Sequence, residues 1–185
     1  MSRLNVDKIT GKTGTNSGAP ITLSGDTATL GSGATLGSAV TFPAGVILGV
    51  ENTTTTTIRA KNNTTYETVI SDSITVKANS KVLINVSIPI SANTDSTPAG
   101  GQILQTGTAS ATIMAATEVM DEHHASSGGY FGGTFMSGVL STAGSYTFSF
   151  QGNRLSGSGT VYFVSANPGS GSPSIATMTL YEIAG

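Results

Sequence analysis

The sequence predicts an all-β protein with an extended N-terminal arm, a short trimeric β-prism stalk and a C-terminal jelly-roll β-sandwich. Three observations indicate this fold class. Gly, Ser and Thr make up 77 of the 185 residues, about 42%, whereas only 10% of residues are charged. A large apolar residue recurs every six positions between residues 28 and 45. After residue 50, apolar residues alternate with small or polar ones in several segments, which is the period of a half-buried strand.

Residues 20–49 are predicted to form the stalk. Three successive hexads, beginning with Ala-Thr-Leu-Gly-Ser-Gly at residue 28, repeat their large apolar residue at an even spacing, so a strand would point each of them to the same side. Three hexads in one chain have no neighbour against which to bury that side, and other copies of the chain are the simplest neighbours. We therefore interpret residues 20–45 as one third of a trimeric prism; the alternative is a Gly-rich linker. The predicted axis residues are Leu30, Leu36 and Phe42.

Residues 50–185 are predicted to form the jelly-roll head. Strict alternation over residues 81–91 and 145–151 marks its clearest strands. The expected core residues of these strands are Val82, Ile84, Val86, Phe148 and Phe150. Shorter strands are expected at 53–59, 66–70, 73–77, 102–106, 111–114, 130–139, 160–165 and 175–183.

Two segments of the head need separate interpretation. Pro89 cannot donate a backbone hydrogen bond, so its strand should have a free edge or a bulge there. Residues 113–124 have some helical character, but the β-rich flanks favour a strand.

Composition excludes several classes of protein. Eight Lys and Arg residues, spread thinly in a chain of net charge −2, do not make a nucleic-acid-binding face. The absence of Cys excludes a disulfide scaffold and a thiolate metal site. No window of 18 apolar residues predicts membrane insertion, and the first residues lack the apolar core of a secretory signal, which favours synthesis in the cytosol.

The motifs for catalysis are weak, and we expect no enzyme and no cofactor. The Gly11-Lys12-Thr13 segment lacks the Gly that a phosphate-binding loop needs at position 6, where Val6 stands. His123 and His124 are adjacent, so in a strand they would point to opposite faces. In a trimer, three copies of one of them could hold a metal on the axis; the alternative is a polar loop tip.

Four glycines between residues 128 and 133 flank Tyr130 and Phe131. Glycines beside aromatic residues leave rings lying on exposed backbone, as in sugar-binding surfaces. They equally allow the rings to pack at a tight contact between subunits, and the sequence leaves both interpretations open.

Several segments carry a family resemblance. The opening Leu4-Asn5-Val6-Asp7-Lys8-Ile9, the Ala-Pro-Ile-Thr-Leu at 19–23 and the hexads as far as Phe42-Pro43-Ala44-Gly45 resemble the N-terminal segment of virion structural and tail-fibre-like proteins of marine bacteriophages, cyanophages in particular. The remainder is similar to C-terminal domains of such proteins, through Ser-Lys-Val-Leu-Ile-Asn-Val at 80–86 and the final strand at 177–183. That domain type is similar to the trimeric jelly roll of tumour necrosis factor and complement C1q.

The resemblance implies a homotrimeric, non-enzymatic virion protein that is made in the cytoplasm of a bacterial host. Residues 1–19 would dock on the capsid or tail, because their apolar residues lie in a segment too short to bury them and their cations can pair with an acidic partner. The expected docking residues are Arg3, Leu4, Val6, Lys8 and Ile9.

Two function classes remain open within this fold. One is adhesion, in which a short tail fibre or spike binds a host-surface glycan or protein. The other is a structural role as a capsid decoration, head fibre or tail-assembly part. A bacterial C1q-like or adhesin module is a more distant alternative.

Overall fold

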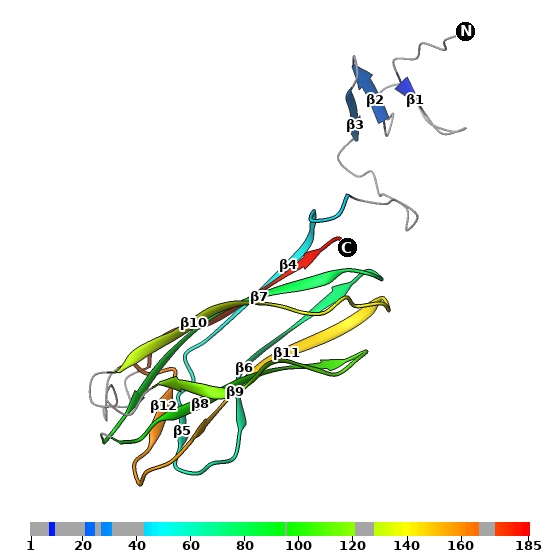
Figure 1. The fold of residues 1–185 in the computed structure, drawn as a ribbon. Coiled ribbons are helices and arrows are strands. Elements are labelled where there is room, and N and C mark those ends of the chain that lie inside the picture. Colours follow the sequence, from blue (N-terminus) through cyan, green and yellow to red (C-terminus); the bar gives the residue numbers. More distant parts are fainter. Residues whose placement is uncertain are drawn as a thin grey trace. The chain divides into compact units, whose positions relative to one another are not determined.

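The computed structural model describes residues 8–9, 21–24, 27–30, 43–94, 96–120, 128–166 and 173–185. The chain divides into two compact units, Met1–Thr41 and Phe42–Gly185, and every regular element in the described ranges is a β-strand (Figure 1). No helix in these ranges is long and apolar enough to cross a membrane.

The first unit contains a small antiparallel sheet in the order β1-β2-β3. Its strands are β1 (Lys8–Ile9), β2 (Ile21–Ser24) and β3 (Thr27–Leu30). β2 and β3 form a hairpin in which Leu30 is opposite Ile21, so the first hexad begins in the second arm of that hairpin.

The predicted docking and axis residues fall only partly within the described chain. Lys8 and Ile9 form β1, and Leu30 ends β3. The others, Arg3, Leu4, Val6, Leu36 and Phe42, lie outside the described residues. The trimeric prism and the docking role therefore stay predictions.

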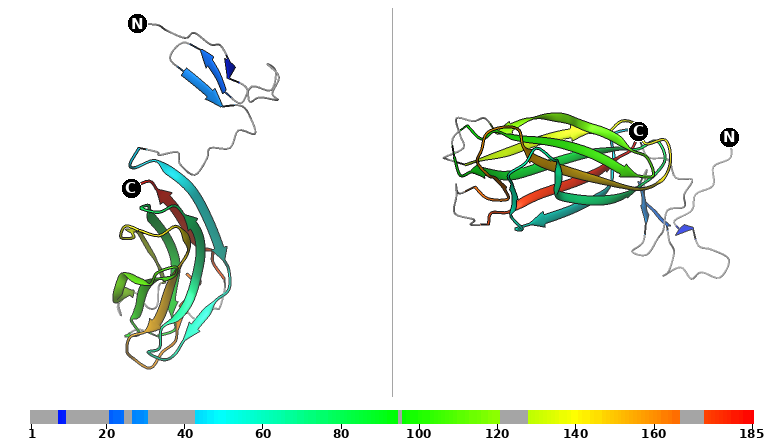
Figure 2. Two further views of the ribbon diagram at one scale, coloured as in Figure 1. Left: turned by 90° about the vertical axis from the view of Figure 1, so that its right-hand side faces the viewer. Right: turned by 90° about the horizontal axis from the view of Figure 1, so that it is seen from below.

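The second unit is a sandwich of two antiparallel sheets. Its strands are β4 (Ile47–Thr55), β5 (Arg59–Lys61), β6 (Glu67–Val76), β7 (Lys81–Ala92), β8 (Ala99–Gly107), β9 (Ala111–Met120), β10 (Gly129–Met136), β11 (Gly144–Arg154), β12 (Val161–Phe163) and β13 (Ala176–Ile183). Figure 2 shows the two sheets stacked face to face.

The strand order is that of a jelly roll. One sheet has the order β4-β13-β7-β10 and the other β6-β11-β8-β9, while the short β12 and β5 extend the first sheet. If the eight long strands are counted along the chain, the sheets read 1-8-3-6 and 2-7-4-5, the double Greek key arrangement. The predicted all-β jelly-roll class is therefore confirmed for this unit.

The core lies between the sheets. Val82, Ile84, Val86, Phe148 and Phe150 are each at most 1% exposed. Each fully buried side chain of this size contributes about 1.5–3 kcal/mol by leaving water.

Aromatic rings join the sheets across this core. The ring of Phe150 on β11 packs against Phe131 of β10 at a centroid distance of 5.4 Å, and against Phe163 of β12 at 6.1 Å. Residues from both sheets therefore pack in one continuous interior.

Several predicted boundaries differ from the structure. β4 begins at Ile47, so residues 47–49 belong to the sandwich and not to the stalk. The apolar run after the Gly45 turn, where φ is +87°, already pairs with β13. The predicted 66–70 and 73–77 strands are one strand, β6, and the segment at 111–120 is a strand rather than a helix.

Pro89 occupies a gap in the pairing of β7 with β13 and β12, on the side away from β10. β13 pairs with β7 as far as Ser87, and β12 pairs with it from Ile90 onward. The carbonyl oxygen of Pro89 accepts a hydrogen bond of 2.7 Å from the backbone N–H of Val164. The missing N–H of Pro89 therefore falls where one partner strand replaces another, which is neither a sheet edge nor a bulge.

Candidate interaction surfaces

The outer face of the β4-β13-β7-β10 sheet carries an apolar row that crosses all four strands. In register, Tyr181 of β13 lies opposite both Val50 of β4 and Leu83 of β7, and Leu83 lies opposite Met136 of β10. Val50 and Met136 are 53% and 50% exposed, and the two central side chains are half-buried. We call these four residues the apolar row.

The rest of this outer face is almost uncharged; on one side of the apolar row it is polar, and on the other Ile183 lies opposite the 55% exposed Ile47. The next row consists of Asn52, Thr179, Asn85 and Thr134, and Asn52 donates a side-chain hydrogen bond of 2.7 Å to Thr179. Lys81 is the one charged residue among the outward positions of these four strands. A broad face with one cation has little charge to desolvate when another protein surface covers it.

The outer face of the opposite sheet differs in chemistry. Its paired positions are occupied mainly by Ser, Thr and Gln, and these side chains bond one another. Ser73 and Thr147 share a hydrogen bond of 2.8 Å, and Gln102 donates one of 2.7 Å to Gln151. Leu104 is the one large apolar residue among the paired outward positions of β6, β11 and β8. The two faces therefore differ most in the apolar row.

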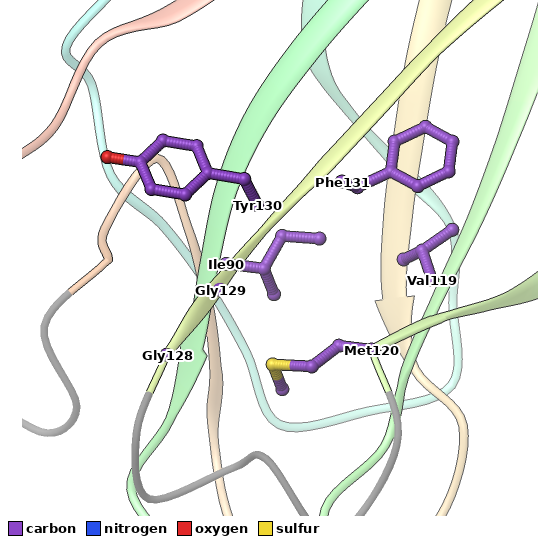
Figure 3. A pocket seen from close by; sticks show the side chains of 7 residues that line it. All are labelled: Ile90, Val119, Met120, Gly128, Gly129, Tyr130 and Phe131. Atoms are coloured by element: carbon purple, nitrogen blue, oxygen red, sulfur yellow. The ribbon is translucent and has the colours of Figure 1, made fainter.

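A small cavity of about 260 Å³ lies at one end of the sandwich, beside the start of β10 (Figure 3). Its lining is apolar apart from backbone and the Tyr130 phenol. Tyr130, 67% exposed, and Phe131 leave β10 on opposite sides, and the Phe131 ring lies over Val119 (Figure 3). Met120 and Ile90 also line this cavity (Figure 3).

The glycines around these aromatic rings are required for different structural reasons. Gly128 has φ +64°, and a Cβ there would collide with the carbonyl oxygen of Ala166. A Cβ at Gly133 would approach the Phe135 ring to 2.8 Å, whereas one at Gly129 meets nothing within 4 Å. Packing therefore explains Gly128 and Gly133, whereas the half-buried Gly129 beside Tyr130 has open space at its Cβ position.

The two histidines lie outside the described residues, in the segment 121–127 that joins β9 to β10. Within the described ranges, no cluster of three or more His, Cys, Asp or Glu side chains could hold a metal ion.

Sequence reasoning missed two buried charged residues, Glu182 and Lys61. Glu182 is 4% exposed and accepts hydrogen bonds from the Lys77 backbone N–H at 2.6 Å and from Ser80 Oγ at 2.7 Å. These bonds fix the turn between β6 and β7 to the last strand. Glu182 has the same parity in β13 as Met178 and Leu180, so alternation alone could have placed it inside.

The second of these residues lies at the other end of the sandwich. Lys61, 4% exposed, pairs with Glu67. Burial raises the pKa of the nearby sequence neighbour Tyr66 above its ordinary value of 10.0. A phenol in that state stays neutral and is no candidate for a base.

Together, the strand order and the almost uncharged outer face define a jelly-roll domain with a surface suited to association. No protein-family model and no curated protein matches the sequence.

Comparison with solved structures finds viral capsid proteins. The VP2 subviral particle of infectious bursal disease virus is 12% identical with a TM-score of 0.42, over 74% of this chain and 38% of that one. A mutant VP2 of the same virus, in T=1 particles, is 10% identical with a TM-score of 0.43, over 86% of this chain and 39% of that one. This chain thus matches less than two fifths of each VP2 chain, and similarity at this level carries no argument about function.

Proposed function

We propose that this protein is a non-enzymatic structural component of a bacteriophage particle. It forms a homotrimeric short fibre or spike that projects from the virion and contributes to attachment to the host surface. The virion assignment rests on the resemblance of the sequence to phage appendage proteins. The trimer rests on the apolar row, which is the observation that carries the proposal.

The apolar row supports association through the β4-β13-β7-β10 face. Its residues belong to all four strands. A neighbouring subunit that contacts all of them would therefore cover the width of the sheet rather than one edge. Val50 and Met136, each about half exposed, would gain most from burial. Exposed apolar patches rimmed by polar residues are typical of protein–protein contacts. Three copies around an axis would cover this face in every subunit.

The two ends of the sandwich would then have different tasks. The chain enters the sandwich at Val46, whose carbonyl oxygen accepts a hydrogen bond from the backbone N–H of Ala184 beside the start of β7. Tyr130 pairs with Pro89 near the other end of β7. The Val46 end of the sandwich would face the particle and the Tyr130 end would face outward, while residues 1–19 would dock through Arg3, Leu4, Val6, Lys8 and Ile9.

A threefold head presents three identical copies of any weak contact, and simultaneous engagement raises the overall affinity. The exposed Tyr130 beside the open backbone of Gly129 is the part of the described surface that best suits a host glycan or protein. The competing proposal is a purely structural role, as a capsid decoration, head fibre or tail-assembly part. The apolar row supports the attachment role and the purely structural role equally.

Gold-labelled antibody against residues 43–185, applied to intact phage particles, tests the proposal. Label at a regular position on capsid or tail is the expected result, and its position separates the fibre from the decoration. Particles that carry no label, while the lysate contains the protein unassembled, would contradict a virion role.

A further inference from the structure

Four exposed charged side chains of the sandwich have no partner within the described part of the chain. They are Glu51 on β4, Arg59 on β5, Lys81 on β7 and Glu118 on β9. None of the four forms an ion pair or a side-chain hydrogen bond with another described residue. Two anions and two cations are therefore free to meet opposite charges on a second molecule.

The sandwich has two open sides, and these charges are divided between them. β4 lies against β6 at one side, and β10 lies against β9 at the other. β5 belongs to the same side as β4, because β12 joins it to β7 on the side away from β10. We call these sides the β4 side, which consists of β4, β5 and β6, and the β10 side, which consists of β9 and β10.

Glu51 and Arg59 lie at the opening of the β4 side. Glu51 is opposite Leu180 and Arg59 is opposite Phe163, and both of these partners are 0% exposed. Residues opposite each other in an antiparallel pair have their side chains on the same face of the sheet. Glu51 and Arg59 therefore occupy inner positions, and they are exposed because β4 and β5 are the last strands of their sheet.

Arg59 and Glu118 lie at the same level, measured along β7, on opposite sides of the sandwich. Arg59 is at the level of Ile90, because Phe163 lies opposite both residues. Glu118 is near that level too, because the next two residues of β9 line one cavity together with Ile90.

Glu51 and Lys81 form a second pair of opposite charges, nearer the end where the chain enters. Glu51 is at the level of Ile84, three residues from Lys81 along β7. That separation is about 10 Å, which a glutamate and the four-carbon stem of a lysine can span together. Between these two levels lies the apolar row, whose ends are Val50 on β4 and Met136 on β10.

We propose that the β4 side of one subunit packs on the β10 side of the next and on the adjoining outer face of β7. Glu51 then lies beside the partner subunit's Lys81, and Arg59 lies beside the partner subunit's Glu118. Opposite charges at two separate levels fix the register of this contact and favour a second copy of the chain as the occupant.

This inference rests on the proposed trimer, with its axis along the strands. Rotation about such an axis keeps every residue at its own level, so contacting residues must have equal levels. A threefold contact also joins two different surfaces of the chain. Val50 therefore meets the partner subunit's Met136, and each of these half-exposed side chains is buried by the other end of a neighbouring apolar row.

Charge reversal tests the two pairs, with light scattering on a dilution series of the full-length protein. Lys81→Glu and Glu118→Lys should each raise the concentration at which half of the trimers dissociate by at least about tenfold, because repulsion replaces attraction. Two matched double variants should restore the wild-type concentration within about threefold. They are Lys81→Glu with Glu51→Lys, and Glu118→Lys with Arg59→Glu.

Lys81→Glu with Glu118→Lys is the control double variant. It has the same net charge as the matched variants, but both pairs are broken, so it should dissociate at least as readily as either single variant. If wild type is a trimer and the control double variant dissociates no more readily than the matched ones, this contact is wrong while the proposed trimer stands. A wild-type monomer would overturn the contact and the trimer together.

Disulfide cross-linking tests the contact without relying on affinity. The chain contains no Cys. Val50 and Met136 of one subunit are three strand spacings apart, about 14 Å, which is too far for a disulfide within that subunit. Val50→Cys combined with Met136→Cys should therefore give covalent trimers after oxidation with copper phenanthroline, as measured on non-reducing gels. Each single variant should give monomers on the gel. Monomers from the double variant under conditions where light scattering shows a trimer, or dimers from a single variant, would overturn the proposal.

Discussion

Ser80 and Glu182 lie 102 residues apart in the sequence and share a buried hydrogen bond of 2.7 Å, donated by the serine hydroxyl to the carboxylate. Because Ser80 precedes β7 and Glu182 lies in β13, this bond joins the hairpin at residues 77–81 to the final strand. It is a polar contact in an interior built mainly from apolar side chains.

Replacing Ser80 with Ala should lower the free energy of unfolding by about 1–3 kcal/mol, because the buried Glu182 side chain loses one of its hydrogen-bond donors. Urea unfolding of both proteins at one fixed concentration measures this, since association would make stability depend on concentration. Ser71→Ala, at an exposed position of β6, should change stability by no more than about 0.5 kcal/mol. Equal effects of the two substitutions would show that the Glu182 contact contributes nothing.

The apolar row gives a sharper test of association. Leu83→Glu should convert the trimer to monomers at micromolar concentration, because three carboxylates would be buried in the contact without partners. Leu104→Glu is the matched control, since it places the same charge on the outer face of the other sheet. Size-exclusion chromatography with light scattering separates the outcomes. If Leu83→Glu stays trimeric while Leu104→Glu becomes monomeric, the subunits associate through the sheet that contains β8. That result would contradict association through the apolar row.

The sequence predicted some strands well because their signal is local. In β7, every second residue from Val82 to Ile90 is buried, and strict alternation marks that strand without knowledge of its partners. The sequence of β9 did not distinguish a strand from a helix, because Ala, Met and Glu are good helix formers. Pairing with β8, interrupted by three register shifts, makes this segment a strand.

The candidate surfaces depend on contacts that sequence patterns do not contain. Val50 and Tyr181 become neighbours only through the register of β4 with β13, which brings together residues from the two ends of the head. The levels of Arg59 and Glu118 likewise depend on the pairing of β5 with β12 and of β9 with β8. The alternation of apolar and polar residues could place each of these side chains on one face of its strand. It could not identify the residues that lie beside it.

The stalk prediction is tested by Leu36→Asp. If Leu36 lies on a threefold axis, each copy contributes about 1.5–3 kcal/mol by leaving water, and three carboxylates there would open the prism. Limited proteolysis should then cleave residues 20–45 faster in the variant, while the head remains a trimer. Thr35→Asp, one position away and so on the other side of a strand, should cleave as wild type does. Equal cleavage of wild type and Leu36→Asp would favour the flexible linker.

Deletion of residues 1–19 tests the docking arm. The truncated protein should remain trimeric, because the head contact is untouched, and it should be absent from assembled particles. Immunoblots of particles purified from cells that express the full-length or the truncated protein give the comparison. A truncated protein that still co-purifies with particles would place docking elsewhere in the chain.

The molar mass of the purified full-length protein is the most direct test of the account. Multi-angle light scattering at micromolar concentration should give three times the chain mass of 18.5 kDa. A mass of 18.5 kDa under the same conditions would contradict the trimer, and with it both the prism and the association through the apolar row.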